Sequence, residues 1–257
     1  MERYKKIGPI KIKDLWFDTD NFLNSKEKIV CLHTNERLEQ QVYDAVFIGQ
    51  TLLLDISQAL DSIYKGFEPK SCRYCIRKSL KDGLIVKQAK TEEEYRKYLD
   101  FENKFCMEKG IPQVSLEEMV KLDVFYALSS KGEFLGGCAF IVSETEKIAR
   151  YKYGSTLHKM NANEAILWKA ICFYHDAGIQ IFDFGGVIPT DDADNYYYRH
   201  YHFKKKFGGT LSNSYNYYKM SGIYKVAYEI WNVIVKLFFD GDLNEATNWL
   251  NRCGLIK

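Results

Sequence analysis

The stretch from residue 133 to residue 186 constrains the fold more than any other part of the chain. It begins with two strand-like runs, "EFLGGCAFIVS" and "KIARYKYGST", joined through a short turn. Apolar residues then recur at helical spacing along "NANEAILWKAICFYHDAG", which ends on Gly178. The strand "IQIFDFGG" follows directly. We therefore predict a β-α-β crossover made of strands within 134–156, a helix over 161–177 and a strand over 179–186.

The segments on either side predict further helices and strands. "SCRYCIRKSLKDG" is typical of a helix that ends at Gly83, and "LIVKQA" is typical of a strand. The run 91–110 predicts a long helix, because Thr91 and Glu94 can form a capping box and Gly110 closes it. A short helix and the strand "TLSNSYNYYK" follow the crossover. The predicted fold is therefore α+β or α/β, with a mixed sheet flanked by helices.

Composition and charge exclude several classes of protein. Of the 257 residues, 46% are hydrophobic and 15% aromatic, as in a globular chain and unlike a disordered one. The net charge is only +2, so binding to a nucleic acid or a membrane would need a local patch. The charged N-terminus "MERYKKIGPIKIKDLW" does not resemble a secretion signal, and seven cysteines without such a signal fit a reducing compartment. We expect a cytoplasmic protein without a membrane-spanning helix.

The last predicted helix, Tyr224 to Phe239, is apolar nearly all round. Its narrow polar stripe is typical of a helix buried in its own core. A weak contact with the inner face of the membrane is the alternative.

The cysteine pairs predict buried side chains. Cys72 and Cys75 share the apolar face of a predicted helix, and they lack the second pair or short-spaced histidines that a structural zinc site usually needs. Cys172 and His175 lie on a helix face that is otherwise apolar, which disfavours a nucleophile with its base. We expect no metal.

The motif "FDFGG", Phe182 to Gly186, is the first candidate for a functional site. Ligands of open α/β sheets bind beyond the carboxyl ends of the strands. The pair Gly185-Gly186 lets another group approach the backbone closely. Asp183 alternates with the flanking phenylalanines and so faces the opposite side of the sheet from both. A tight turn with a structural aspartate is the alternative.

The second candidate is "YYYRHYHFKKKFGG", a predicted helix from Tyr196 to Phe207 that Asp194 or Asn195 caps. The face predicted to pack inward consists of Tyr196, His200, Phe203 and Phe207. Helical spacing makes the three lysines diverge, and only Lys204 is flanked by tyrosines and by the glycine-bearing end. A lysine held beside an aromatic wall suits a place where negative charge develops, as in acyl transfer. Three solvated surface lysines are the alternative.

The order and spacing of five motifs resemble the FemA/FemB-like transferases, a branch of the GNAT acyltransferase superfamily. The motifs are "TLLLDIS" (51–57), "RYCIRKSLKDGLIV" (73–86), "EKGIP" (108–112), "NEAILWKAICFYHDAGIQIFDFGG" (163–186) and "FKKKFGG" (203–209). The resemblance implies a shortened N-terminal GNAT-like subdomain over 1–70, a complete GNAT-like domain over 71–220 and a helical extension over 221–257.

The resemblance also implies an activity, the transfer of an acyl or aminoacyl group to an amine of a cell-envelope or small-molecule precursor. The acceptor is nucleotide- or lipid-linked in some relatives, and the donor is aminoacyl-tRNA or acyl-CoA. In the family the lysine of a Phe-Lys pair lines the active site, and by position this is Lys204 after Phe203. Where coenzyme A enzymes have a glycine-rich pyrophosphate loop, this chain reads "TLHKMNANEA", and Glu164 there would repel phosphate.

We accordingly predict an acyltransferase in which Lys204 stabilises the oxyanion and Asp183 orients or deprotonates the amine. The predicted substrate-binding residues are Phe203, Gly185, Gly186, Tyr201, Arg73 and Arg77. The two arginines are assigned to phosphate groups, with a solvated helix face as the alternative. Two other functions stay open: a coenzyme-A-dependent amino-sugar N-acetyltransferase, and a non-catalytic module that binds tRNA or a glycan.

Overall fold

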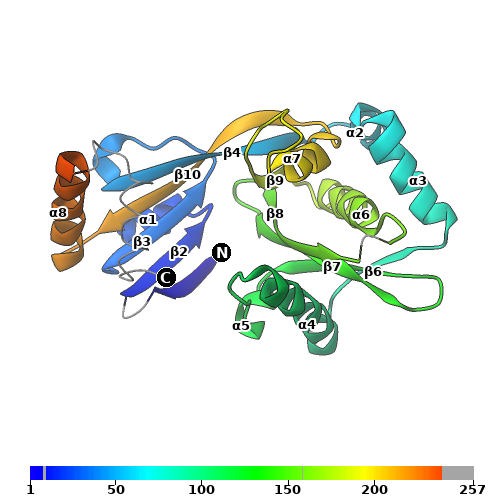
Figure 1. Cartoon of the computed structure of the whole chain (residues 1–257), viewed down its shortest axis with the longest axis horizontal. Coiled ribbons are helices and arrows are strands. Elements are labelled where there is room, and N and C mark those ends of the chain that lie inside the picture. The colour runs from blue at the N-terminus through cyan, green and yellow to red at the C-terminus, as the bar shows by residue number, and fades with distance from the viewer. Residues whose placement is uncertain (8–9, 158, 239–257) are drawn as a thin grey trace. The chain divides into compact units, whose positions relative to one another are not determined.

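A computed structural model describes residues 1–7, 10–157 and 159–238. Within them the chain forms two compact units whose segments interleave along the sequence (Figure 1). The first unit contains Met1, Thr34–Glu36 and Ile48–Tyr215, and the second contains Glu2–His33, Arg37–Phe47 and the chain from Asn216 onward. From the sequence we expect three consecutive segments, 1–70, 71–220 and 221–257, and the bounds of the two units differ from these. Residues 239–257 of the last segment lie outside the described residues. The strands β4 (Ala45–Asp55) and β10 (Thr210–Met220) each contribute residues to both units.

The sheet of the first unit confirms the predicted mixed fold and its crossover. Its further elements are β5 (Ile85–Gln88), β6 (Asp123–Leu128), β7 (Phe134–Ser143), β8 (Ile148–Thr156), α6 (Ala162–Asp176) and β9 (Ile181–Val187). Hydrogen-bonded neighbours follow the order β10–β4–β9–β8–β7–β6–β5. The strands β8 and β9 pair in parallel, and α6 connects them. The pairs β4/β9, β8/β7, β7/β6 and β6/β5 are antiparallel.

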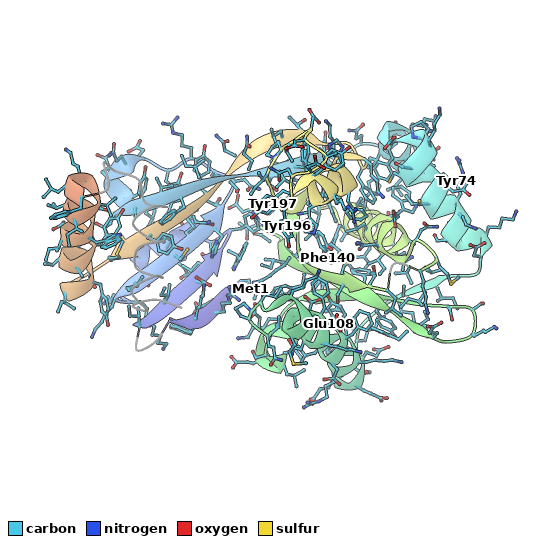
Figure 2. All side chains as sticks on the ribbon, in the orientation of Figure 1. Met1, Tyr74, Glu108, Phe140, Tyr196 and Tyr197 are labelled. Carbon is cyan, nitrogen blue, oxygen red and sulfur yellow. The ribbon has the colours of Figure 1, made fainter. Side chains whose placement is uncertain are left out.

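Helices cover both faces of this sheet (Figure 1). One face carries α6, with α3 (Tyr74–Lys81) packed beside it, and the other carries α4 (Glu92–Lys109) with α5 (Leu116–Met119). The helices α2 (Leu60–Gly66) and α7 (Tyr198–Lys205) complete the unit. The ring of Phe140, labelled in Figure 2, is fully buried and contacts the rings of Phe125, Tyr151, Tyr174 and Phe182.

Local signals in the sequence place both ends of α4. Thr91 forms the predicted capping box of α4, and Gly110 ends the helix with a φ of 65°. The helix predicted over 71–83 begins later, because Pro69 opens a π-helical turn, η2 (Pro69–Arg73), and α3 follows it. Cys72 in this turn is buried, as predicted, whereas Cys75 is half-buried.

The second unit is built on three N-terminal strands, β1 (Glu2–Ile7), β2 (Ile10–Trp16) and β3 (Ile29–Thr34). Its strand order is β1–β2–β3–β10–β4. β1 and β2 are antiparallel, whereas β2 and β3 are parallel and are connected through the short helix α1 (Thr19–Asn24). A 3-10 turn, η1 (Gln40–Val42), precedes β4.

The helix α8 (Ile223–Phe238) belongs to the second unit, and the prediction that it is buried in its own core is wrong over the described residues. Val235 is its buried residue there, while six large apolar side chains are more than half exposed: Ile223, Val226, Ile230, Val233, Leu237 and Phe238. The described residues include no helix with the length and apolarity that a membrane span requires.

Candidate active site

A bulge in β9 shapes the candidate site. The ladder between β8 and β9 ends at the pair Arg150/Asp183, and the register of β9 against β4 shifts just beyond Thr51. Gly185 adopts a φ of 73°, in the left-handed region that favours glycine. A Cβ atom on Gly185 would also lie 2.6 Å from the carbonyl oxygen of Tyr151, so no other residue fits. Bulges of this kind reorient backbone groups beside functional sites.

Asp183 is fully buried and accepts hydrogen bonds from four groups. Its Oδ1 accepts from the hydroxyl of Thr51 and, at 2.7 Å, from the amide of Gly185. Its Oδ2 accepts from Nδ2 of Asn35 and from Nη1 of Arg150, each at 3.0 Å. The carboxylate therefore holds the bulge and the Arg150 guanidinium in place. From the sequence we predict that Asp183 orients or deprotonates a substrate amine. In the structure both carboxylate oxygens already accept hydrogen bonds from the protein and the side chain is fully buried, so Asp183 is not placed to contact a substrate directly.

The ammonium group of Lys204 on α7 lies against the glycine pair. Its Nζ donates a hydrogen bond of 2.8 Å to the carbonyl oxygen of Gly186 and would lie 3.8 Å from a Cβ atom on Gly185. Nζ also stands 5.7 Å from the centroid of the Tyr151 ring. The proximity of Lys204 to the glycine pair, expected from the sequence, is therefore present. The aromatic neighbour differs from the expected one, because it comes from β8 and not from α7.

Burial lowers the pKa of Lys204 to about 8. The charge of Asp183 raises this pKa, and the charge of Arg150 lowers it. Since Asp183 already pairs with Arg150, Lys204 forms no ion pair within the described ranges. Most Lys204 side chains are therefore protonated at pH 7, and the ammonium has a backbone carbonyl as its hydrogen-bond partner.

The helix that carries Lys204 packs through other side chains than predicted. The helix begins at Tyr198, two residues later than predicted. In the turn before it, the amide of Tyr197 donates a hydrogen bond of 2.9 Å to Oδ1 of Asn195. Tyr201 and Phe207 are buried, whereas Tyr196 is 74% exposed. The predicted inward face is therefore wrong at Tyr196, which the later start leaves outside the helix, and at His200, which is exposed.

Lys206, at the end of the same helix, forms an ion pair. Its Nζ lies 2.6 Å from Oε1 of Glu164 and 4.4 Å from the centroid of the Phe203 ring. Glu164 is in the first turn of α6, whose N-cap residue Asn161 has a φ of 52° and makes no side-chain cap. From the sequence we predict that Glu164 repels phosphate at this helix end. In the structure, Lys206 offsets that negative charge.

The two arginines predicted to contact phosphate lie on or beside α3. Arg77 is exposed, which also fits the alternative of a solvated helix face. Arg73 is half-buried, and its Nε has no hydrogen-bond partner in the described part of the chain. Their roles stay predictions.

Sequence reasoning missed Thr51, Arg150 and Asn35, the three side chains that bind Asp183. Arg150 lies within the predicted strand 147–156, opposite Asp183 in the parallel register. An arginine inside a strand that flanks a crossover could have suggested a buried carboxylate partner. Asn35 lies 148 residues before Asp183, and the sequence holds no signal for that contact.

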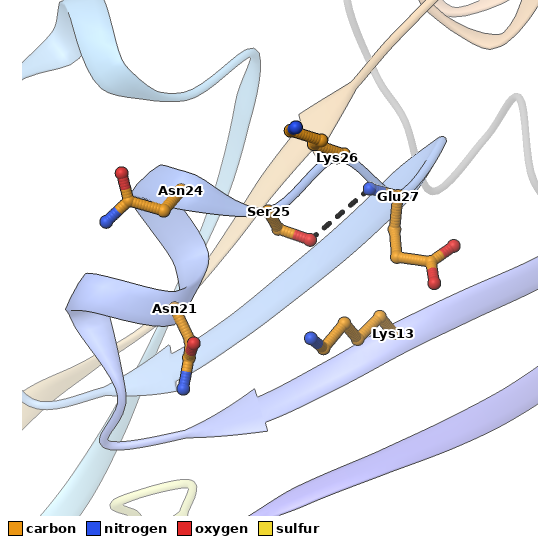
Figure 3. Close-up of a pocket in the computed structure, with 6 residues that line it drawn as sticks. All are labelled: Lys13, Asn21, Asn24, Ser25, Lys26 and Glu27. Atoms are coloured by element: carbon orange, nitrogen blue, oxygen red, sulfur yellow. Dashed lines mark hydrogen bonds between the residues drawn. The ribbon is translucent and has the colours of Figure 1, made fainter.

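A polar hollow in the second unit shares no residue with this cluster. Its cavity volume is about 400 Å³ (Figure 3), and its lining consists of Lys13, Asn21, Asn24, Ser25, Lys26 and Glu27. The amide of Glu27 donates to Oγ of Ser25 at 3.4 Å, and Lys13 pairs with Glu2 at 3.0 Å. The lining side chains are exposed or half-exposed, and we assign no chemistry to them.

No protein-family model and no curated protein matches this sequence. Among solved structures, FemX aligns with 88% of this chain and 85% of its own, with a TM-score of 0.62 and 13% identity. This chain shares its fold with FemX.

Two further structures are similar in the same way. L-PGS from Bacillus licheniformis aligns with 88% of this chain and 84% of its own, with a TM-score of 0.59 and 12% identity. The C-terminal domain (DUF2156) named for a lysylphosphatidylglycerol synthetase of Agrobacterium fabrum covers 91% and 85%, with a TM-score of 0.55 and 13% identity. At these identities the likenesses confirm the predicted GNAT-like, FemA/FemB-like fold, and they concern the fold alone.

Proposed function

We propose that this chain is an acyltransferase that forms an amide bond between an activated acyl or aminoacyl group and an amine. The observation that carries the proposal is the half-buried ammonium of Lys204, held against Gly186 in a fold shared with FemX. Among the described residues this ammonium has no carboxylate partner of its own. A half-buried positive charge without its own carboxylate favours a ligand that develops negative charge beside it.

In the proposed reaction the amine nitrogen attacks the carbonyl carbon of the donor. A C–N bond forms, and the carbonyl oxygen becomes an oxyanion. Nζ of Lys204 carries three N–H groups, and one donates to Gly186, so two remain for the oxyanion. One such donor typically contributes about 3 kcal/mol to transition-state stabilisation. Collapse of the intermediate expels the oxygen or sulfur leaving group, which takes up the proton that the amine releases.

His200 is our candidate for moving that proton. It lies one helical turn before Lys204 on α7, and its side chain is accessible. Partial burial, followed by the positive charges of Lys204 and Lys109, lowers its pKa below the usual 6.5. The imidazole is therefore neutral at pH 7 and able to accept a proton. In this proposal Asp183 is a positioning residue, which acts through Arg150 and the Gly185 amide.

The proposal leaves two classes of donor, aminoacyl-tRNA and acyl-CoA. The name of the Agrobacterium fabrum synthetase combines an aminoacyl group with a phospholipid, which supports the first class and a lipid-linked acceptor. The Lys206–Glu164 pair offsets the charge that disfavours phosphate near the start of α6, which supports the second class. Substrate contacts of Tyr201, Phe203, Arg73 and Arg77 remain part of the proposal.

The test begins with a thermal-shift screen of acyl-CoAs, charged tRNA, nucleotide sugars and lipid-linked amines. Donors and acceptors that stabilise the chain are then combined, and the N-acylated product is measured by mass spectrometry. We expect product from at least one such pair, and slower formation with His200→Gln. Binding of both substrates without any transfer would contradict the proposal.

A second candidate function is a non-catalytic module for tRNA or a glycan. It is favoured by exposed rings and exposed positive charges along α7 and in the turn before it, namely Tyr196, Tyr197, Arg199 and Lys205. RNA binding through this patch should weaken steeply with salt in a filter-binding assay. Binding of acetyl-CoA in calorimetry would favour the coenzyme-A-dependent N-acetyltransferase over this binding module and over transfer from aminoacyl-tRNA.

A further inference from the structure

Two neighbouring strands of the second unit, β2 and β3, bring three polar side chains together. Asp14 on β2 is the register partner of Cys31 on the parallel strand β3. His33 lies two residues after Cys31, so both side chains face the same side of the sheet. Asp14 and Cys31 are buried, at 4% and 1% exposure, and His33 is half-buried.

The ligand atoms of these three residues converge on one point. One carboxylate oxygen of Asp14, Sγ of Cys31 and one ring nitrogen of His33 all lie within 4.8 Å of one another. Nε2 of His33 is 3.5 Å from Sγ and 3.6 Å from Oδ1 of Asp14. Because both contacts use the same ring nitrogen, the three residues cannot act as a nucleophile, base and orienting acid, which requires both nitrogens.

The surrounding residues orient this set as metal ligands are usually oriented. Nδ1 of His33 lies 2.6 Å from Oδ1 of Asn216 on β10, which makes Nδ1 the protonated nitrogen and leaves the Nε2 lone pair facing Cys31 and Asp14. The ring of Trp16 stacks on His33 at 4.0 Å between centroids. Nε of Arg3 donates to Oδ2 of Asp14 at 2.9 Å, so the other oxygen, Oδ1, remains directed at His33.

We propose that Asp14, Cys31 and His33 bind a zinc ion, a site separate from the acyl-transfer function proposed above. Zinc prefers nitrogen, sulfur and carboxylate ligands in a tetrahedron, with bonds of about 2.3 Å to sulfur and about 2.0 Å to nitrogen or oxygen. Those bonds place sulfur and nitrogen roughly 3.5 Å apart and nitrogen and oxygen roughly 3.3 Å apart. The separations of 3.5 and 3.6 Å are close to both values before any adjustment. Water occupies the fourth position.

Such an ion links β2 to β3, which are joined only through α1 and a loop in the sequence. Chelation should therefore lower the melting temperature of the folded chain, because the metal binds the native state and stabilises it by mass action. Activity need not change, since none of the three ligands belongs to the Lys204 cluster.

The test uses the tag-free full chain, loaded with Zn²⁺, dialysed and measured by mass spectrometry for metal content. We expect one zinc per chain in the wild type, and binding at least about 100-fold weaker in Cys31→Ser and His33→Gln. Asn216→Leu, which removes only the partner of Nδ1, should weaken binding by about 10-fold. Cys106→Ser is the matched control, because Cys106 is equally buried but lies outside the set.

Cobalt loading keeps the test decisive if a ligand variant fails to fold. Co²⁺ bound by this set should give a thiolate-to-cobalt charge-transfer band in the wild type and in Cys106→Ser, and the band should be absent in Cys31→Ser. A wild type without stoichiometric metal or without the band would overturn the proposal and leave a hydrogen-bonded polar cluster. Unchanged metal content in both Cys31→Ser and His33→Gln would overturn it as well. Lys204→Met should retain the metal, which separates this proposal from the failure of the proposed function.

Discussion

Two lysines on one short helix have contrasting environments. Lys206 lies 2.6 Å from Glu164, and this ion pair is largely shielded from solvent, with side-chain exposures of 13% and 12%. Lys204 has Asp183 as its carboxylate neighbour, but Arg150 already pairs with that carboxylate. Two lysines two residues apart therefore differ in proposed function because of their partners and not because of their residue type. A lysine with its own carboxylate stabilises the fold, whereas one without a carboxylate can respond to a substrate.

Asp183→Asn should lower the free energy of unfolding more than a substitution of either lysine. It removes the carboxylate whose pairing with Arg150 leaves Lys204 without an ion pair. The amide group would place N–H donors among the donors of Asn35, Arg150 and Gly185. Breaking a buried charged network of this kind costs about 3–5 kcal/mol in the free energy of unfolding. Urea denaturation measures the loss. Thr51→Ser, which keeps the hydroxyl beside Asp183, is the control, and equal stability of Asp183→Asn and wild type would contradict the assigned role.

Lys204→Met tests the lysine without a carboxylate directly. Turnover should fall by about 100-fold, the effect of removing one oxyanion donor. The melting temperature should stay the same or rise, because a buried charge without an ion pair is lost. Lys205→Met removes an exposed lysine from the same helix and should retain full turnover. If Lys204→Met were as active as wild type, the proposed mechanism would fail.

Lys206→Met should lower stability and leave turnover nearly unchanged, the opposite of Lys204→Met. Removal of the ammonium leaves Glu164 partly buried without its partner, and we expect a loss of about 2 kcal/mol in the free energy of unfolding. Turnover per folded molecule should change little. The double variant Lys206→Met with Glu164→Gln should recover part of the lost stability. If the two single changes were strictly additive in a double-mutant cycle, the two side chains would not be coupled.

Changes of pH should affect turnover and stability least, and they test whether Lys204 titrates near pH 8. Turnover should rise as His200 loses its proton below pH 6.5 and fall as Lys204 loses its proton near pH 8. Between pH 8 and the ordinary lysine pKa of 10.5, the unfolded chain binds more protons at Lys204 than the folded chain does. Raising the pH through this window should therefore increase the contribution of Lys204 to the free energy of unfolding.

The control for this profile is Lys204→Arg, whose guanidinium stays charged at every pH used. Its turnover, though lower, should lack the fall near pH 8. Persistence of that fall in Lys204→Arg would assign it to another group.

Sequence reasoning predicted the framework of the site better than its chemistry. Gly185, Gly186 and Lys204 were identified from a strand end and from helical spacing, and the structure brings them together. The face of α7 was predicted wrongly, because one hydrogen bond to Asn195 delays the start of the helix and changes which side chains lie within it. Asp183 was identified as polar and important, but its four donors come from separate parts of the chain.

Local sequence patterns were enough to predict the β-α-β crossover, the capped helix α4 and the glycine pair at the end of β9. These features depend on periodicity, caps and backbone freedom, which act over a few neighbouring residues. Which lysine keeps a charge without its own carboxylate depends on contacts between distant parts of the chain. The partners of Lys204 and Lys206 lie 18 and 42 residues away along the chain, and packing of α7 against β9 and α6 assigns a carbonyl to one lysine and a carboxylate to the other.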